Sequence, residues 1–495
     1  MTDAIHDRRS HNGPGYIVQS LGDLMITHNA KSRRFCLGAS GFSLGSIALA
    51  EMIAGATPTA SSEALKTIGP HFAPKAKHVI YLHMVGAPSQ LDLFDAKPEL
   101  VKRHNQPCPE EVTKGRDFAF IGKTSTLAGS PWSFKPHGQS GQVLSELLPN
   151  LATVVDEITV VRSVHTDEIN HAPAQMFLHS GFGRGGRPGL GAWVTYGLGS
   201  ENADLPSYVV LLSGPPGGAG TSLWSPGFLP SVYQGIQFRS KGDPVLFLSS
   251  PDGYQPDDRR RELDTLRELN QLQQEVTGDP ETATRISQYE LAFRMQTSVP
   301  ELMGISEETT ATLEMYGARP GEASFANNCL LARRLVERGV RYIELYDSDW
   351  DHHRGLKSRL PAKCKDVDQA MSALIEDLKA RGLLSETLIV WGSEFGRTPL
   401  SQGGDGNGKD VSGRDHHKDA YTMWLTGGGI KGGISHGRTD DFGMDIVESP
   451  VHVHDLNATI LHLLGLDHKR LTYRYQGRDF RLTDVHGEVV RPILW

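Results

Sequence analysis

Short apolar runs alternate with amphipathic stretches along this chain, and that alternation is the strongest constraint on its fold. Apolar runs of strand length occupy residues 78–85, 157–164, 207–214, 340–349, 387–396 and 420–430. Helix-like stretches at 327–339 and 367–384 each precede one of these runs. Runs that are apolar throughout are typical of strands buried on both faces. The pattern therefore predicts an α/β fold, in which helices sandwich a mainly parallel sheet.

A single large domain at 75–495 accommodates all of these segments. Between residues 257 and 303 the chain is highly charged and carries leucines at helical spacing, including Leu263, Leu266 and Leu269. This stretch predicts a helical insertion on the domain surface, at about 255–305.

The N-terminal region has the layout of an export signal. Arg33 and Arg34 precede an uncharged run at 35–50, and a small-residue Ala-Gly-Ala pattern follows at 54–56. The run is too short to span a bilayer, so no transmembrane segment is expected. Residues 1–56 resemble a twin-arginine signal, followed by a linker at 57–74. We therefore expect export by the twin-arginine machinery to the periplasm or cell surface; the alternative is a tail with a chance arginine pair.

The charge balance argues against nucleic-acid or membrane-surface partners. The 495 residues include 50 lysines and arginines against 58 acids, which gives a formal net charge of −8. A mildly acidic protein is poorly matched to a polyanionic partner. A small-molecule or glycan substrate is the expected partner.

Three polar clusters lie at the edges of predicted strands. The run at 340–349 leads into Asp-Ser-Asp-Trp-Asp-His-His at 347–353, the run at 387–396 contains Gly-Ser-Glu, and Gly-Arg-Asp-His-His at 413–417 precedes the last strand. Ligands bind at the carboxyl ends of strands in such sheets, and so many carboxylates and imidazoles together favour a divalent cation. Mixed ligands of this kind suit zinc, manganese or iron, whereas carboxylates alone suit calcium or magnesium. Each cluster taken singly could equally be a loop cap or a surface charge.

Longer motifs resemble known families. ALIEDLKARGLLSETLIVWGSEFG, VHDLNATILHLLGLDH and MWLTGGGIKGG resemble segments of the alkaline phosphatase and sulfatase superfamily. More closely, GAPSQLDLFDAKPEL, NHAPAQ, WDHH, SEFGRTP, GRDHH and GGGIKGG resemble an exported bacterial family designated domain of unknown function 1501, over about residues 75–494. The resemblance implies an alkaline phosphatase/sulfatase-like fold and a metal-dependent hydrolase.

The resemblance also implies a ligand set. It makes Asp351 and His353 an Asp/His ligand pair, places Glu394 where the superfamily has a metal-binding Asp, and places His416 or His417 near its last metal-binding histidine. Phe395 stands where a second ligand would follow Glu394. One divalent metal (zinc, manganese or calcium) is therefore the expectation, rather than two.

Further ligands and anion-binding groups complete the prediction. The first strand lacks the superfamily's terminal metal-binding Asp, and Asp92 on the following loop is preferred to His83 as its substitute. Arg397 and Arg414 are candidates for clamping an anionic substrate group, and His417 is a further substrate-binding candidate.

The stretch NHAPAQMFLHSG at 170–181 resembles the nucleophile segment of sulfatases without its nucleophile. His171 replaces the residue that becomes formylglycine, and Gln175 replaces its arginine partner. His171 is then a metal ligand or a general base, with Asn170 beside it at a helix start. Ser163 and Thr166 are alternative hydroxyl nucleophiles, and Asn170 could simply cap the helix.

Three functions remain open from the sequence. The first is an exported metal-dependent hydrolase acting on a sulfate or phosphate ester, without the usual sulfatase nucleophile. The second is a non-catalytic exported protein that binds a metal or a glycan. The third is a metallohydrolase that uses metal-bound hydroxide on another bond.

Overall fold

The computed structural model describes residues 67–495 apart from 117, 123–124, 240–243, 246–252, 254, 278–279 and 403–411. The expected export signal at 1–56, with Arg33 and Arg34, and the first part of the linker lie outside the described residues. The remainder of the expected linker lies against the domain, because the Gly69 N–H donates to Gly197 O (2.8 Å) and the His71 N–H donates to Gly465 O (2.8 Å). Among the described residues, no helix has both the length and the apolar character that crossing a membrane requires.

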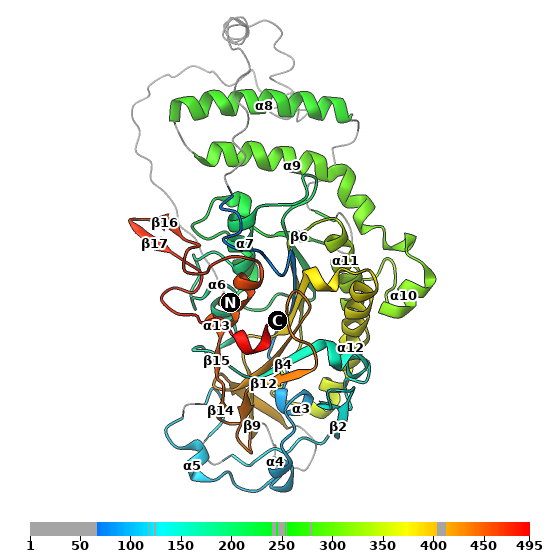
Figure 1. The fold of residues 1–495 in the computed structure, drawn as a ribbon, viewed down its shortest axis with the longest axis vertical. Helices are drawn as coiled ribbons and strands as arrows, with labels where there is room; N and C mark the ends of the chain where they lie inside the picture. The colour runs from blue at the N-terminus through cyan, green and yellow to red at the C-terminus, as the bar shows by residue number, and fades with distance from the viewer. Residues whose placement is uncertain are drawn as a thin grey trace, which may run out of the picture. The chain divides into compact units, whose positions relative to one another are not determined.

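A central sheet forms the middle layer of the domain (Figure 1). Its strands are β1 (His78–Met84), β4 (Ile158–His165), β5 (Tyr208–Ser213), β6 (Ile236–Phe238), β7 (Tyr342–Asp347), β8 (Thr387–Gly392), β11 (Tyr421–Thr426), β12 (Ile434–His436) and β15 (Val451–His452). They are ordered β12-β4-β11-β8-β1-β7-β5-β6, and β15 also pairs with β4. All pairings are parallel except those of β11, which runs antiparallel to β4 and β8. The prediction of a mainly parallel sheet between helices is confirmed.

Helices cover both faces of the sheet. The larger core cluster joins Ile80, Leu82 and Met84 of β1 to α11 (Phe325–Glu337) and α12 (Leu356–Ala380). The second cluster joins Val79 and Tyr81 to α6 (His171–Ser180), α7 (Leu190–Leu198) and α13 (Val453–Leu463). Alternate residues of β1 thus face opposite layers, as the period of a strand requires.

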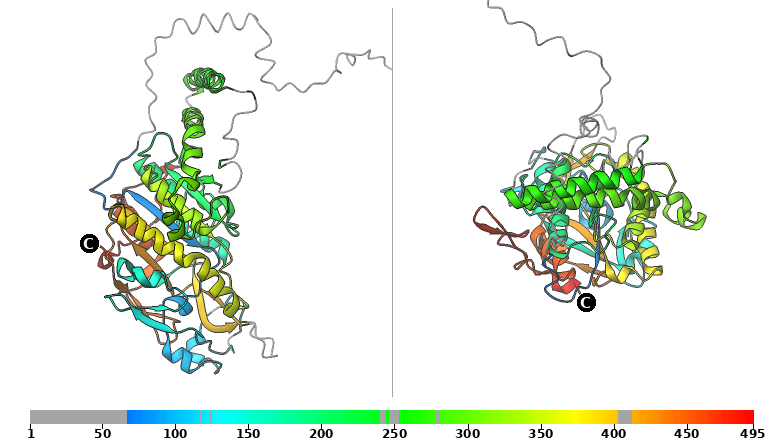
Figure 2. Two further views of the ribbon diagram at one scale, coloured as in Figure 1. Left: turned by 90° about the vertical axis from the view of Figure 1, so that its right-hand side faces the viewer. Right: turned by 90° about the horizontal axis from the view of Figure 1, so that it is seen from above.

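Two long helices occupy the region that the sequence marks as an insertion. They are α8 (Pro256–Thr277) and α9 (Pro280–Met303), and they pack against each other (Figures 1 and 2). α9 also contacts α11 and the short 3-10 turn at Ser231–Tyr233, and both join the pair to the body of the domain.

Shorter elements lie outside these layers. They are α3 (Gln90–Leu93), α4 (Pro98–Lys102), α5 (Glu110–Thr113), α10 (Thr310–Tyr316), β2 (Phe134–His137), β3 (Gln142–Ser145), β9 (Gly396–Gln402), β10 (Gly413–His417), β13 (Arg438–Thr439), β14 (Ile446–Glu448), β16 (Tyr473–Tyr475) and β17 (Arg478–Phe480).

Two local expectations need correction. α12 begins at Leu356 rather than near residue 367, and it contains Pro361. The segment 413–417, expected only to precede a strand, is itself the strand β10, which pairs antiparallel with β9. This pairing fixes the direction of its polar side chains, which a free loop would not do.

Candidate metal centre

The turn after β1 supports the loop that follows β7. Gly86 has φ +109°, and a Cβ on it would lie 2.6 Å from Asp351 N, so only glycine fits there. The Trp350 N–H donates to Val85 O across the same contact (3.2 Å). Ala87 and Asp349 both have positive φ, 63° and 73°, which is uncommon for residues other than glycine. The two strand-end turns therefore hold Asp351 in a fixed place.

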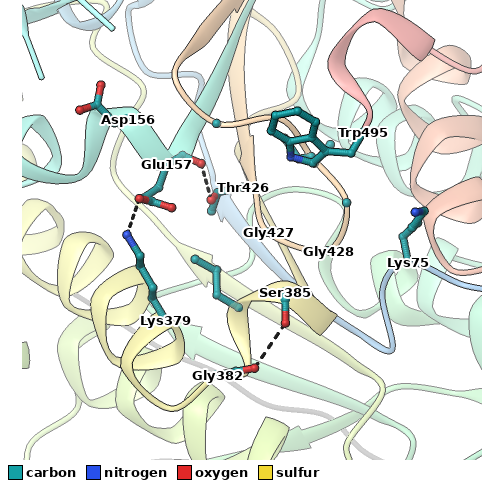
Figure 3. A pocket seen from close by; sticks show the side chains of 14 residues that line it. Lys75, Asp156, Glu157, Lys379, Gly382, Ser385, Thr426, Gly427, Gly428 and Trp495 are labelled. Carbon is teal, nitrogen blue, oxygen red and sulfur yellow. Dashed lines mark hydrogen bonds and ion pairs between the residues drawn. The ribbon is translucent and has the colours of Figure 1, made fainter. Parts of the chain in front are cut away.

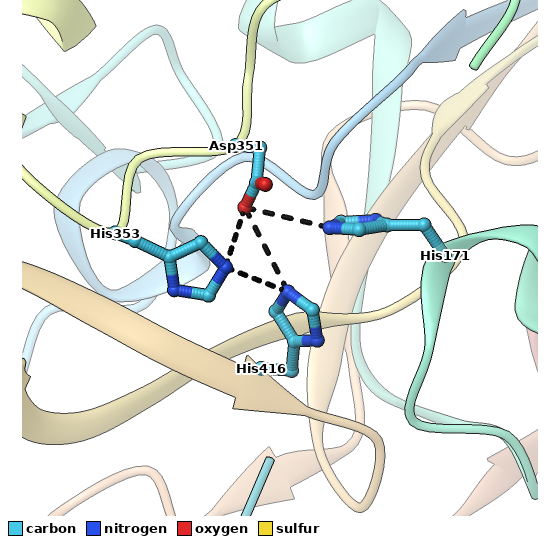
Figure 4. Close-up of side chains that lie close together, drawn as sticks. All are labelled: His171, Asp351, His353 and His416. Carbon is cyan, nitrogen blue, oxygen red and sulfur yellow. Dashed lines mark hydrogen bonds and ion pairs between the residues drawn. The ribbon is translucent and has the colours of Figure 1, made fainter. Parts of the chain in front are cut away.

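Four side chains converge at this edge of the sheet (Figure 4). His171 begins α6, Asp351 and His353 follow β7, and His416 lies on β10. One donor atom from each lies within 4.8 Å of all the others. The Nε2 atoms of His353, His171 and His416 lie 2.9, 3.4 and 3.7 Å from the same atom, Asp351 Oδ1.

The opposite nitrogen of each imidazole is held by a separate acceptor. His171 Nδ1 donates to Glu394 Oε1 (2.7 Å), His353 Nδ1 donates to Gln402 Oε1 (2.6 Å), and His416 Nδ1 donates to Ile169 O (2.8 Å). These oxygens only accept, so each Nδ1 carries a proton, and the Nε2 of a neutral ring is left with the lone pair that a metal would take. An outer acceptor of this kind usually accompanies a histidine that ligates a metal.

Electrostatics at the cluster favour a bound cation. Burial lowers the pKa of His171, but the carboxylates of Asp351 and Glu394 outweigh it and raise the pKa to about 9. Burial alone would raise the pKa of Asp351. The hydrogen bonds of Asp351 with the three histidines and the charge of Arg397 outweigh burial and hold this pKa well below its usual range. When no metal is bound, His171 is therefore protonated. A divalent cation would have to displace this proton in order to bind.

Glu394 supports His171 from behind and does not belong to the group of four. Its buried carboxylate accepts from His171 Nδ1, from the Gly86 N–H (3.1 Å) and from Gln175 Nε2 (3.1 Å) on one oxygen. The other oxygen accepts from the Ser393 hydroxyl (2.5 Å). We expected Glu394 to be a metal ligand. In the structure, both of its carboxylate oxygens instead accept hydrogen bonds from protein groups.

Asp92 and Arg414 form a buried ion pair of their own. Arg414 Nε and Nη2 donate to the two oxygens of Asp92 at 2.7 and 3.0 Å, and both side chains are at most 1% exposed. Arg414 also donates to Ala128 O (2.7 Å). Neither the expected ligand role of Asp92 nor the expected substrate role of Arg414 matches this pairing.

Arg397 and His417 also face the protein rather than a substrate. Arg397 is 1% exposed, donates to Asp351 Oδ1 (2.5 Å), and donates to the carbonyls of Ala87 and Arg414. It therefore fixes Asp351 instead of clamping an anion. His417 is buried, and its ring Nε2 lies 2.9 Å from Met444 O.

The remaining candidates flank α6. Asn170 occupies the N-cap position of α6, but its side chain makes no capping hydrogen bond. The Ser163 hydroxyl donates to Ser449 O (2.5 Å) and is fully buried, so it is not placed to attack a substrate. The Thr166 hydroxyl is buried without a hydrogen-bond partner.

Phe120 is a neighbour of the cluster that the sequence did not indicate. Its ring lies edge-on to His353 and His416, with centroids 5.0 and 5.3 Å away, and it is 63% exposed. The carboxylate of Asp415, next to His416 on β10, accepts from the Phe120 N–H (2.9 Å). Neither this contact nor the role of Gln402 follows from sequence spacing, because both depend on how distant segments pack.

A cavity of about 610 Å³ lies away from this cluster (Figure 3). Two polar contacts lie within its lining: Lys379 pairs with Glu157 (2.5 Å), and the Thr426 hydroxyl donates to Glu157 O (2.6 Å). None of the described residues that line it belongs to a group of potential metal ligands like the one around Asp351, so the group of four is the better functional candidate.

Fold and site together define an α/β protein with three imidazoles and one carboxylate gathered at the carboxyl edge of a mainly parallel sheet. Residues 76–494 match the family described as "Protein of unknown function (DUF1501)". The match spans most of the chain, and the chain belongs to this family.

Solved structures similar to this chain include sulfatases and alkaline phosphatases. Ps i-CgsB, solved in complex with k-i-k-neocarrahexaose, is 11% identical over 79% of this chain and 72% of its own, with a TM-score of 0.34. The PsFucS1 sulfatase from Pseudoalteromonas sp. is 12% identical over 79% and 68%, with a TM-score of 0.34. The alkaline phosphatase from the Antarctic bacterium TAB5 is 12% identical over 73% and 95%, with a TM-score of 0.27. Comparison with curated proteins gave no match.

Proposed function

We propose that the chain is an exported metal-dependent hydrolase that acts on a sulfate or phosphate ester. The observation that carries the proposal is the gathering of three imidazole Nε2 atoms around Asp351 Oδ1, each imidazole being held from behind by its own acceptor. A bound divalent cation would polarise an ester oxygen and lower the pKa of a coordinated water.

The donor set fits a transition metal. Three imidazole nitrogens and one carboxylate suit zinc or manganese, whereas calcium prefers oxygen ligands throughout. We therefore favour zinc or manganese over calcium. Asp351 is 41% exposed and His171 and His353 are 24% and 23% exposed, so the cluster is open to a substrate from solvent.

The chain's own residues would each have a defined task. His171, His353, His416 and Asp351 would hold the metal. Arg397 would keep Asp351 in place, and Glu394 would keep the Nδ1 proton on His171. Asn170 lies beside the cluster with its side chain free of a capping role.

Turnover of sulfate and phosphate esters by metal-loaded protein tests this proposal. Aryl and sugar esters of both acids should be hydrolysed only with metal, and Asp351→Ala should abolish the activity. His137→Ala is a matched control, because His137 lies on β2, outside the cluster. Equal activity of Asp351→Ala and the unmodified protein would refute the proposal.

One observation favours a second function, a non-catalytic metal-binding protein. Four protein ligands are the number found in closed structural zinc sites, whereas catalytic sites keep a position open. Cobalt substitution distinguishes the two, because a closed tetrahedral site and a five-coordinate site have different visible spectra. A tetrahedral spectrum together with no turnover on the ester panel would favour the non-catalytic function.

Export is a separate part of the proposal and rests on the N-terminal sequence alone. Replacing Arg33 and Arg34 together by lysine should leave the protein in the cytoplasm on cell fractionation. Unchanged export of this variant would rule out the twin-arginine route.

A further inference from the structure

An exposed aromatic ring lies at the rim of the candidate metal centre. Phe120 is 63% exposed, and among the Phe, Tyr and Trp side chains that the structure describes only Trp495 is more exposed. Its ring is nearly perpendicular to those of His353 and His416, with interplanar angles of 86° and 83°. Phe120 therefore contacts two candidate ligands while most of its surface stays open to solvent.

A buried carboxylate holds the backbone at Phe120. Asp415 Oδ2 accepts from the N–H groups of Phe120 (2.9 Å) and Ile121 (3.2 Å). Asp415 Oδ1 accepts from the His416 N–H (2.9 Å). Asp415 is fully buried, and these three donors offset the cost of burying its charge. Phe120 is thus tied to β10 beside a candidate metal ligand.

The rest of this segment is anchored to the domain as well. Phe118 and Ile121, which flank Phe120, both pack against a small apolar core that consists of Leu91, Leu100, Leu127, Leu400 and Met444. Further along, the Ala128 N–H donates to Pro399 O of β9 (2.7 Å). The backbone at Phe120 is therefore held on both sides, and its ring faces the cluster of four rather than this core.

The exposure of Phe120 distinguishes it from a residue that only shields the imidazoles. Such a role belongs to Phe395, which is buried and whose ring centroid lies 4.5 Å from that of His416 and 4.9 Å from that of His171. Phe120 contacts His416 from the rim and keeps a large apolar surface uncovered. A fixed side chain loses little conformational freedom when a ligand covers it, so this surface is suited to binding.

The chemistry of the phenyl ring defines what would cover it. Its face is apolar and carries no hydrogen-bonding atom, so a partner must present an apolar face of its own. Rings stack with their centroids about 4.5–7 Å apart. Because Phe120 lies 5.0 and 5.3 Å from the rings of His353 and His416, a ring stacked on it would lie next to a group bound at the cluster.

We propose that Phe120 is a specificity-determining residue, which stacks on a ring of the substrate and selects esters of ring compounds over small acyclic esters. A sugar ring and an aryl ring share the required chemistry, since each has an apolar face. This assignment rests on the proposed function, because the stacked ring is selected only if the ester group binds at the metal centre.

Binding of three phosphonates tests the assignment without turnover, because an ester hydrolase does not cleave their carbon–phosphorus bond. Benzylphosphonate carries an aryl ring, the 6-phosphonate of 6-deoxyglucose carries a sugar ring, and methylphosphonate carries no ring. Calorimetry on the zinc-loaded full chain measures each Kd. Phe120→Ala should raise the Kd of at least one ring phosphonate by about tenfold and that of methylphosphonate by less than about twofold. The ring phosphonate that loses affinity identifies the substrate ring as aryl or sugar.

Two further variants separate stacking from a structural role. Phe120→Trp keeps a ring and should bind the ring phosphonates within about threefold of the unmodified protein. Phe72→Ala is the matched control, because Phe72 is also exposed (38%) but packs against His462, and it should change no Kd. Zinc content, measured for each variant, should stay at one equivalent.

Three results would overturn the assignment while the proposed function stands. They are unchanged Kd values for both ring phosphonates in Phe120→Ala, an equal loss for all three phosphonates or of zinc in that variant, and zinc-loaded unmodified protein that binds none of the three. If the unmodified protein binds no zinc, the proposed function fails, and the assignment fails with it.

Discussion

The Nε2 atoms of His353 and His416 lie 2.9 Å apart, while the Nδ1 atom of each is held by a different oxygen acceptor. Two lone pairs at this separation repel unless a proton or a cation lies between them. The adjacent Asp351 carboxylate supplies negative charge, so the arrangement suits a divalent cation. We therefore treat this contact as the central feature of the candidate site.

Replacing either histidine should remove the metal. His416→Ala and His353→Ala each delete one ligand, so the metal Kd should rise by at least about 100-fold, more than when an outer partner is lost. His417→Ala is a neighbouring control: its ring faces Met444 O, so it should lose stability but keep its metal. Retention of one tightly bound metal by His416→Ala would contradict the assigned ligand set.

Glu394→Gln should weaken metal binding without changing its stoichiometry. The carboxylate supports His171 through Nδ1, and loss of such an outer partner typically costs about 10–100-fold in affinity. Titration with zinc and a competing chelator measures the change. A loss as complete as that of Asp351→Ala would place Glu394 among the ligands.

Asp92→Ala should destabilise the fold and leave metal affinity unchanged in the folded protein. It would leave the buried Arg414 guanidinium without its bidentate partner, which costs about 3–5 kcal/mol. Asp445→Ala, which removes a more exposed pairing with Arg116, should cost less than about 1 kcal/mol. Urea unfolding compares the two variants, and equal losses of stability would contradict this account of Asp92.

Stability should fall in mild acid because of His454. Burial, together with the nearby His452 and His486, lowers the pKa of His454 to about 4, against about 6.5 in an unfolded chain. The unfolded state therefore binds more protons between these values, and stability falls as pH drops from about 6.5 towards 4, by on the order of 3 kcal/mol in total.

Unfolding free energies of the unmodified protein and His454→Asn, measured from pH 7 to 4.5, check this. The variant should show the smaller decline. Parallel pH profiles for the two proteins would show that His454 does not cause the acid sensitivity.

The sheet could be predicted from sequence because its strands are buried on both faces. β1 and β7 are largely apolar runs, and each was predicted to within two residues at both ends. β8 begins at the predicted residue but ends at Gly392, four residues before the end of the run at 387–396. The orientation of β11 was not predictable in this way, because an apolar run has the same appearance in a parallel and an antiparallel pairing.

The candidate site was predictable in part. Asp351, His353, His416 and His171 all appear among the sequence candidates, because polar residues at strand ends and at a helix start meet at one edge of an α/β sheet. Spacing does not reveal which polar groups satisfy one another across the fold. Asp92 and Arg414 are far apart in sequence and pair in the core, and Glu394 turns towards His171 instead of joining the cluster.

The metal content of the purified full chain is the most direct test of the central claim. After incubation with zinc and manganese, separately and together, and removal of free ions, mass spectrometry should find one equivalent of metal in the unmodified protein. His353→Ala and Asp351→Ala should each retain far less. The absence of stoichiometric metal from the unmodified, folded protein would contradict the account.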